Sequence, residues 1–214
     1  MQETCATIDS LYKAGKFKRF GLSNFLPAQV QEVYDCCKAN DYVLPTVFQG
    51  MYSPVTRHPE ADLIPLCRKL GISYNAYSPI AGGFLVKSVE TMKNGGVGRW
   101  DPNHPAGKLY HSLFNRPKML EGLQQWEDVA NDTGLGKAEM AFRYARYHSA
   151  LDGDKGDGIV IGATKPEQLE QALLAIEKGP LEANVTKRID AIWETVKDDA
   201  PYDTYQGQDR KESL

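Results

Sequence analysis

Short apolar segments alternate along this chain with stretches in which apolar residues recur every three or four positions. Four apolar segments bounded by turn residues are typical of buried strands, and they span residues 18–22, 46–49, 72–77 and 159–162. The helical pattern after the first of them includes Val30, Val33 and Cys37. Strands that alternate with helices predict an α/β fold in which parallel strands are joined by crossovers.

The rest of the chain divides into helices, one long connection and a tail. Helical patterns predict further helices at about 117–132, 137–149 and 182–198. Glycines and prolines crowd residues 80–115, which predicts a long irregular loop that serves as a lid. The polar residues 203–214 predict a frayed tail, so residues 1–202 form the folded unit.

The number of strands indicates half of a larger architecture. A closed (β/α)8 barrel, the TIM-barrel fold, needs eight strand–helix units, and this chain supplies four. We therefore expect a half-barrel followed by a C-terminal helix. Such a half-barrel leaves two strand edges unpaired and an apolar inner face partly uncovered. These features favour a homodimer or another association through the open barrel edges.

Composition excludes several classes of protein. The 214 residues are 42% hydrophobic and carry a net charge of −3 without a basic block, which argues against a nucleic-acid partner. No apolar run approaches the length of a membrane span, and the first residues lack the pattern of a signal peptide. The four cysteines have no metal-site spacing and are expected to be free thiols. We expect a cytoplasmic protein without membrane or metal partners.

The carboxyl ends of the predicted strands carry neutral side chains. Active sites of parallel α/β folds lie at these ends, yet none of the four carries Asp, Glu, His or Cys. A glycosidase would need two carboxylates across the scissile bond, and a metal site would need a cluster of ligands. The sequence therefore predicts neither a catalytic acid–base residue nor a metal ligand at the strand ends.

The neutral side chains at the strand ends suit a flat ligand that bears an amide. Ser23, Asn24 and Gln49 can donate to and accept from a carboxamide, and Tyr77 offers an aromatic face for stacking. Taken alone, an Asn at a strand end is more often a helix cap, and a lone Tyr is more often a core residue. Together, in this order, they indicate a nicotinamide ring.

Two further features suit phosphates. The turn of residues 78–83 exposes backbone N–H groups where a pyrophosphate could approach, and Lys165 stands beside the start of a helix. The glycines of residues 156–162 imitate a dinucleotide fingerprint, but they precede their strand instead of following it. The sequence thus indicates a nicotinamide dinucleotide laid across four strand ends.

Several motifs together resemble the aldo-keto reductases, and in particular the aflatoxin-aldehyde reductase group and its fungal relatives. The resemblance extends from about residue 3 to 202. It rests on Gly21–Phe25, Gln49–Tyr52, Ala76–Gly83, Gly98-Arg99, Gln168–Gln171 and Glu177–Leu181.

The resemblance implies strands 5–8 of a (β/α)8 barrel, the cofactor NADP(H), and hydride transfer that reduces a small aldehyde or ketone to an alcohol, in detoxification or in fungal secondary metabolism. Carried over by position, the residues that would hold the carboxamide and stack on the nicotinamide are Ser23, Asn24, Gln49 and Tyr77. Those that would meet the pyrophosphate, the 2′-phosphate and the adenine are Ser78, Ile80, Gly82, Thr164, Lys165 and Gln168. Arg99 is a further candidate for contact with the phosphates or with a substrate carboxylate.

The chain departs from the family pattern in two ways. Ala172 stands where the family usually has an Asn near the adenine. The family's catalytic Asp, Tyr, Lys and His lie on strands two to four, upstream of the first strand here, so we expect a truncated reductase that is inactive or nearly so by itself. The alternative is a non-catalytic truncated product, or a partner-binding half-barrel with residual nucleotide binding.

Overall fold

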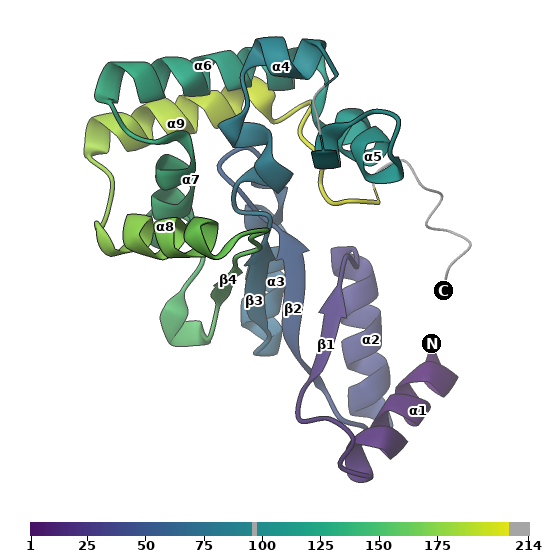
Figure 1. Ribbon diagram of the computed structural model, residues 1–214. Helices are drawn as coiled ribbons and strands as arrows, with labels where there is room; N and C mark the ends of the chain where they lie inside the picture. The colour runs from purple at the N-terminus through teal and green to yellow at the C-terminus, as the bar shows by residue number, and fades with distance from the viewer. Residues whose placement is uncertain (96–97, 206–214) are drawn as a thin grey trace.

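Four parallel strands form one sheet (Figure 1). The computed structural model describes residues 1–95 and 98–205. The strands lie side by side in sequence order and are β1 (Phe20–Ser23), β2 (Pro45–Met51), β3 (Ser73–Tyr77) and β4 (Gly158–Val160). This topology confirms the predicted α/β class with four parallel strands. It is consistent with a partial (β/α)8 barrel.

Three helices accompany the first three strands. These are α1 (Gln2–Lys13), which precedes β1, α2 (Pro27–Ala39) and α3 (Leu63–Leu70). The predicted stripe of Val30, Val33 and Cys37 is buried in α2. A short 3-10 turn, η1 (His58–Glu60), precedes α3, and α3 ends at Gly71, whose φ of 70° is left-handed, as the sequence indicated.

The connection between β3 and β4 is more ordered than predicted. It contains the 3-10 segments η2 (Ala81–Val86), η3 (Gly98–Trp100) and η4 (Gly153–Lys155), and the helices α4 (Val89–Lys93), α5 (Pro105–Phe114), α6 (Pro117–Thr133) and α7 (Lys137–Tyr147). The chain closes with α8 (Pro166–Glu177) and α9 (Ala183–Val196). The helices predicted at 117–132, 137–149 and 182–198 are confirmed.

The prediction of an irregular loop over residues 80–115 is wrong for residues 80–95 and 98–115, which form short helices, whereas residues 96–97 lie outside the described residues. Pro105 does not break a helix but occupies the first turn of α5, where its missing N–H costs no hydrogen bond. The side chain of His104 caps α5, and that of Ser88 caps α4. Phe84 and Phe114 are fully buried, so this segment is part of the core and not a loose cover.

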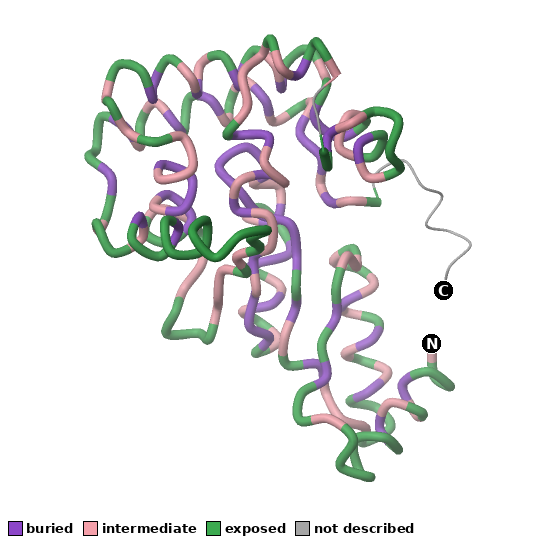
Figure 2. The backbone as a smooth tube through the Cα atoms, in the orientation of Figure 1, coloured by how far each residue is buried: buried purple, intermediate pink, exposed green. Residues whose placement is uncertain are grey.

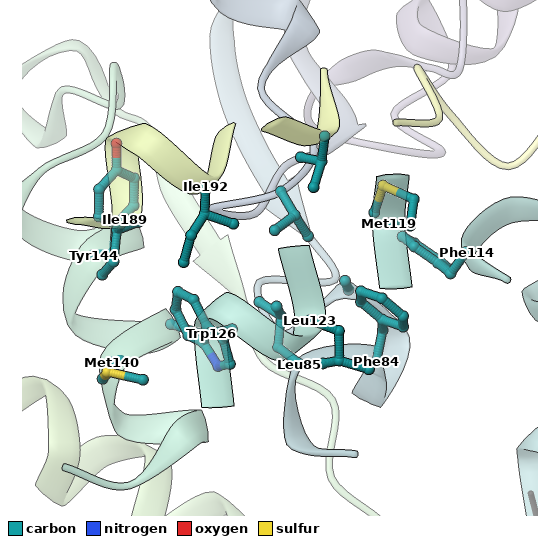
Figure 3. Close-up of a cluster of buried hydrophobic side chains, with 14 of the residues drawn as sticks. Phe84, Leu85, Phe114, Met119, Leu123, Trp126, Met140, Tyr144, Ile189 and Ile192 are labelled. Atoms are coloured by element: carbon teal, nitrogen blue, oxygen red, sulfur yellow. The ribbon is translucent and has the colours of Figure 1, made fainter. Parts of the chain in front are cut away.

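The buried side chains form two clusters. One joins η2 with the long helices and holds Phe84, Phe114 and Trp126 among others, as Figure 3 shows. The other joins the sheet with α1, α2 and α3, and includes Phe48 and Tyr74. The first cluster holds together the helical connection, and the second fixes the sheet that carries the strand ends.

The two faces of the sheet differ in polarity. Phe20, Leu22 and Phe48 are buried in the cluster that packs on the helices, whereas Ser23 and Gln49 are exposed. The sequence predicted an apolar inner face, and on β1 and β2 this face combines the exposed Ser23 and Gln49 with the half-buried, apolar Val47. Alternation along a strand places successive side chains on opposite faces, so these polar residues share one face.

The segment after α9 is also better packed than predicted. Asp203 is only 3% exposed, and the hydroxyl of Tyr202 donates a 2.9 Å hydrogen bond to Oδ1 of Asp62. The Asp203 carboxylate in turn accepts a 2.7 Å bond from the backbone N–H of Tyr205. The predicted frayed tail is therefore wrong for residues 203–205, and residues 206–214 lie outside the described residues.

Other expectations concern the chain as a whole. None of the described helices combines the length and the apolar character that a membrane crossing requires. Three of the cysteines are buried, Cys36 is half-buried, and all four are free thiols. Within residues 1–95 and 98–205, no group of His, Cys, Asp and Glu side chains could hold a metal ion.

Candidate functional site

The carboxyl ends of the strands lie along one edge of the sheet. Ser23 of β1 lies opposite Gln49 of β2, and further along the edge Met51 lies opposite Tyr77 of β3. Tyr77 in turn lies opposite Val160 of β4. Neighbouring strands are about 4.8 Å apart, so Ser23 and Gln49, both exposed, present adjacent hydrogen-bonding groups.

Asn24 and Tyr77 are joined directly. Asn24 leaves β1 in the left-handed conformation, with a φ of 58°, which asparagine tolerates better than most residues. The hydroxyl of Tyr77 donates a 2.7 Å hydrogen bond to Oδ1 of Asn24. This bond turns the oxygen of the Asn24 amide toward Tyr77 and its NH2 group away from it. The two side chains thus form one prearranged unit at the strand ends.

The hydroxyl of Tyr77 is poorly suited to act as an acid. Burial raises the pKa of Tyr77, and a hydrogen bond with Thr204 opposes that rise only in part. The proton therefore stays on the phenol at neutral pH, where it is used in the bond to Asn24. The ring can offer an aromatic face, but its hydroxyl is committed to a structural role.

The turn after β3 is made of unusual backbone conformations. Ser78 and Ala81 have φ values of 58° and 52°, and Gly82 follows at 64°. The N–H of Ala81 donates to Ser78 O at 2.7 Å, and the next bond in the turn runs from the N–H of Gly83 to Ile80 O at 3.0 Å. Left-handed non-glycine residues are uncommon and concentrate at functional sites. Two of them, in one turn at a strand end, mark this turn as a candidate site.

The predicted lid residue Arg99 reaches this turn through an aromatic contact. Its guanidinium carbon lies 5.9 Å from the ring centroid of Tyr110, and a Cβ on Gly82 would clash with that ring. Trp100 stacks on Tyr110 at 5.1 Å and donates from Nε1 to the carbonyl oxygen of Gly82 at 3.0 Å. The structure thus brings Arg99 beside the β3 turn. It also shows a role for Tyr110, which no sequence signal indicated.

The remaining predicted residues form a second group at the start of α8. Oε1 of Gln168 accepts hydrogen bonds from the N–H of Thr164 at 2.9 Å and from its hydroxyl at 3.0 Å. Lys165 occupies the N-cap of α8, and all three residues are exposed. A cation beside the positive end of a helix dipole is suited to bind a phosphate.

Sequence reasoning missed the residues that follow α9. Tyr202 and Asp203 line a small hollow together with Asn24, Phe48 and Tyr74. The signal that could have found this contact was Tyr202, an aromatic residue at the end of the predicted folded unit, directly before the polar tail. The C-terminal segment therefore borders the strand-end site, next to the side chain that Tyr77 holds in place.

A partly buried network of hydrogen bonds and ion pairs supports the strand ends. The N–H of Tyr52 donates to the carbonyl oxygen of Tyr77 at 3.1 Å, and the hydroxyl of Tyr52 donates to Glu60. Arg57 bonds Glu60 and reaches Asp190 of α9 at 2.7 Å. Burial and the neighbouring Glu60 carboxylate raise the pKa of Tyr52, so its phenol remains a donor. These contacts tie the end of β2 to the end of β3.

Comparisons with known proteins match most of this chain to one family. The sequence profile of the aldo/keto reductase family matches residues 1–194. The chain is 41% identical to the oxidoreductase sirO of Leptosphaeria maculans over 201 residues, 94% of this chain and 61% of that protein. It is 37% identical to the mouse aflatoxin B1 aldehyde reductase member 2, over 94% of this chain and 56% of that protein. An aldo-keto reductase of Pseudocercospora fijiensis is 38% identical over 94% of this chain and 68% of its own length. The chain thus spans roughly three fifths of the length of these relatives.

Proposed function

Because the chain belongs to the aldo/keto reductase family, we propose that its strand ends bind NADP(H) for the reduction of aldehydes or ketones to alcohols. The observation that carries this proposal is the hydrogen bond from Tyr77 to Asn24, beside the adjacent pair Ser23 and Gln49. It sets an aromatic face next to three amide or hydroxyl groups, which is the donor set that a nicotinamide carboxamide needs.

The residues of the chain fit the parts of this cofactor in order. The NH2 group of Asn24, with Ser23 and Gln49, would hold the carboxamide, and Tyr77 would stack on the ring. The turn that holds Ser78, Ile80 and Gly82, in which Ser78 and Gly82 are left-handed, would face the pyrophosphate, with Arg99 nearby. Lys165, Thr164 and Gln168 at the start of α8 would bind the adenosine end.

Lys165 is the reason to propose NADP(H) in preference to NAD(H). The two cofactors differ by one phosphate on the adenosine ribose, and an exposed cation at a helix N-terminus recognises such a group. The bond between Thr164 and Gln168 uses the amide oxygen of Gln168, and its NH2 group can then donate to an anion or a base.

The side chains that are present determine which parts of the reaction this chain can perform. When bound, NADPH supplies the hydride. The chain orients the cofactor, but Tyr77, whose pKa is raised by burial, is not a proton donor at neutral pH, and the residues at the strand ends include no other acid. Carbonyl reduction needs an acid to protonate the developing alkoxide. We propose that the 214-residue chain alone reduces carbonyls only at trace rates, and that the family's Asp, Tyr, Lys and His complete the reaction in the longer enzyme.

The substrate class is also a proposal. Several relatives carry the name aflatoxin B1 aldehyde reductase, and we propose small, reactive aldehydes as substrates for the complete enzyme. A cytoplasmic location, where NADPH is abundant, fits this role.

Turnover of NADPH with a reactive aldehyde tests the proposal. The chain is purified and incubated with NADPH and aldehyde, with a boiled sample and a sample without aldehyde as controls. We expect no more than trace oxidation of NADPH above these controls. Turnover at an ordinary reductase rate of about 1 s⁻¹ or faster would show that the chain holds an acid of its own, and would overturn this division of work.

A further inference from the structure

The short turn η1 connects the end of β2 with helix α9. Its last residue, Glu60, accepts a hydrogen bond from the hydroxyl of Tyr52. Tyr52 directly follows β2 and is fully buried, and residues 50–56 are buried without a break, as Figure 2 shows. The turn therefore meets the strand end through a buried phenol.

Arg57, directly before η1, fixes the carboxylate of Glu60. Its Nε donates to both oxygens of Glu60 at 3.2 Å, and its Nη2 donates to Oε2 at 3.1 Å. Nη1 of the same guanidinium donates to Oδ1 of Asp190 in α9 at 2.7 Å. The guanidinium carbon also lies 5.4 Å from the ring centroid of Tyr144 and 5.9 Å from that of Trp193. A planar guanidinium held on several sides is a rigid partner for a carboxylate, so Glu60 has a defined position.

Tyr52 links Glu60 to the residue that presents the aromatic face. The backbone N–H of Tyr52 donates to the carbonyl oxygen of Tyr77 at 3.1 Å. This bond continues the pairing of β2 with β3 by one residue, because Met51 lies opposite Tyr77 in the sheet. Tyr52 is thus held at its hydroxyl by Glu60 and at its N–H by Tyr77. Movement of the Tyr52 side chain would therefore be felt by the backbone of Tyr77.

The same turn also contacts the C-terminal segment beside Asn24. Nε2 of His58, the first residue of η1, donates to the carbonyl oxygen of Ala200 at 3.2 Å. The ring of His58 stacks on that of Tyr202, with centroids 6.0 Å apart, and Tyr202 lines the hollow next to Asn24. Both members of the Tyr77–Asn24 pair therefore have neighbours that η1 holds in place.

We propose that Glu60 is a positioning residue for the nicotinamide half of the cofactor site, and that it acts through Tyr52 on the backbone of Tyr77. The inference rests on the proposed NADP(H) site. Glu60 itself would not touch the cofactor, since its carboxylate is occupied by Tyr52 and Arg57. Immobilising a mobile group on binding costs affinity, and a Tyr77 fixed in advance keeps that cost low. Loss of the Glu60 contact should weaken binding of the nicotinamide half and leave the adenosine end at α8 unaffected.

Two buried tyrosines provide a matched pair of variants. Tyr52→Phe removes the hydroxyl that Glu60 holds and keeps the ring in the core, and the NADPH dissociation constant is expected to rise about threefold to tenfold. Tyr144→Phe is the control, because Tyr144 is 1% exposed and donates its hydroxyl to a carboxylate of α9, that of Asp190, at 2.8 Å. It should lose similar stability in urea and keep the native affinity. An equal loss of affinity in both variants would overturn the proposal.

A second ligand separates positioning from a general loss of structure. Adenosine 2′,5′-bisphosphate carries the 2′-phosphate of NADPH but no nicotinamide, so it probes only the adenosine end at Lys165. The native chain and Tyr52→Phe should bind it with the same dissociation constant. If Tyr52→Phe weakens the binding of both ligands by the same factor, the change acts on the fold as a whole and the positioning role is contradicted.

Changes at Glu60 test whether it acts through Tyr52. Glu60→Ala should raise the NADPH dissociation constant about tenfold, and Glu60→Gln, which keeps an acceptor oxygen for the hydroxyl of Tyr52, should recover most of the native affinity. Glu60→Ala combined with Tyr52→Phe should bind no more weakly than Glu60→Ala alone, because both changes break the same contact. Additive losses in the combined variant, or a Glu60→Gln chain as weak as Glu60→Ala, would contradict this path.

Amide hydrogen exchange of the chain without cofactor, measured by NMR, distinguishes a failure of this inference from a failure of the proposed function. The N–H of residue 52 donates to Tyr77 O, and Tyr52→Phe should accelerate its exchange about tenfold. Tyr144→Phe should leave the exchange of this N–H nearly unchanged. Unchanged exchange in Tyr52→Phe, when the native chain binds NADPH, overturns this inference alone. A native chain that does not bind NADPH overturns the proposed function and this inference together.

Discussion

The hydroxyl of Tyr77 donates a 2.7 Å hydrogen bond to Oδ1 of Asn24, although 53 residues separate them in sequence. Tyr77 ends β3 and Asn24 follows β1, so the bond passes over the end of the intervening strand β2. It fixes the edge of an aromatic ring and the orientation of an amide in one contact. A site whose groups are set in place before the ligand arrives loses less entropy on binding.

Two replacements of Tyr77 should distinguish the contribution of its ring to NADPH binding from that of its hydroxyl. Tyr77→Ala removes both, and the NADPH dissociation constant is expected to rise about tenfold, since stacking contributes about 0.5–1.5 kcal/mol. Tyr77→Phe keeps the ring and should have a smaller effect. Tyr147→Ala in α7 is the control, because Tyr147 is 38% exposed and bonds Ile176 O. Equal effects of the changes at Tyr77 and Tyr147, measured by equilibrium dialysis, would contradict a stacking role.

Replacement of Lys165 should affect one cofactor more than the other. Lys165→Ala is expected to weaken NADPH binding about tenfold and NADH binding little, because only NADPH carries the extra phosphate. Raising the salt concentration should weaken the native interaction and leave the variant less sensitive. Lys155→Ala, another exposed lysine near β4, is the matched control. An equal loss of affinity for NADPH and NADH would contradict a contact between Lys165 and the 2′-phosphate.

The sequence predicted the regular part of the fold well. Apolar residues recur every second position in a strand with one buried face and every 3.6 positions in a helix with one buried face. The sheet and its flanking helices follow these patterns. The structure of residues 80–95 and 98–115 was predicted incorrectly as irregular because glycine and proline were interpreted as breakers of structure. Pro105 instead starts a helix and Gly82 makes room for the ring of Tyr110. Local composition does not reveal such a tertiary contact.

The candidate site was only partly predictable. Ser23, Gln49 and Tyr77 could be placed because parallel strands put their carboxyl ends at one edge. The bond between Asn24 and Tyr77 depends on a left-handed backbone that no pattern encodes. The approach of Tyr202 and Asp203 to the site depends on how the chain returns after α9. A polar composition alone suggested a frayed end.

Asp157 is expected to be a strong determinant of stability. Its side chain is 1% exposed and pairs with Arg68, and it also accepts from the N–H groups of Tyr74 at 2.7 Å and Asp152 at 2.9 Å. Asp157→Ala leaves all three donors without their acceptor, which should lower the free energy of unfolding by about 3–5 kcal/mol. Asp154→Ala, at an exposed site in η4, should change it little. Urea unfolding compares the two, and a loss below about 1 kcal/mol for Asp157→Ala would contradict its role.

Glu139 should make the stability depend on pH. Burial alone would raise the pKa of Glu139, but hydrogen bonds from Lys178 at 2.7 Å and Arg143 at 2.8 Å outweigh it, and the pKa is lowered from its usual 4.5. A lowered pKa in the folded state stabilises the fold above the unfolded pKa, and this contribution is lost as the pH falls through the folded value. Glu139→Gln should therefore be less stable than the native chain at pH 7.

The difference should shrink as the pH falls below about 4.5, the ordinary glutamate value. Unfolding by urea at several pH values measures it. Glu121→Gln at an exposed pair with Lys118 is the control and should show a much smaller difference at pH 7. A difference that stays constant down to acidic pH would contradict the ionic origin.

A fluorescence titration of the native chain with NADPH tests the central claim, that the strand ends form a dinucleotide site, most directly. We expect saturable binding with a dissociation constant above about 1 μM, because ordering each of the long exposed side chains costs about 0.5–1.5 kcal/mol. The chain with both Tyr77→Ala and Lys165→Ala should show much weaker binding. The absence of saturation up to millimolar NADPH, or equal binding by the doubly changed chain, would contradict the claim.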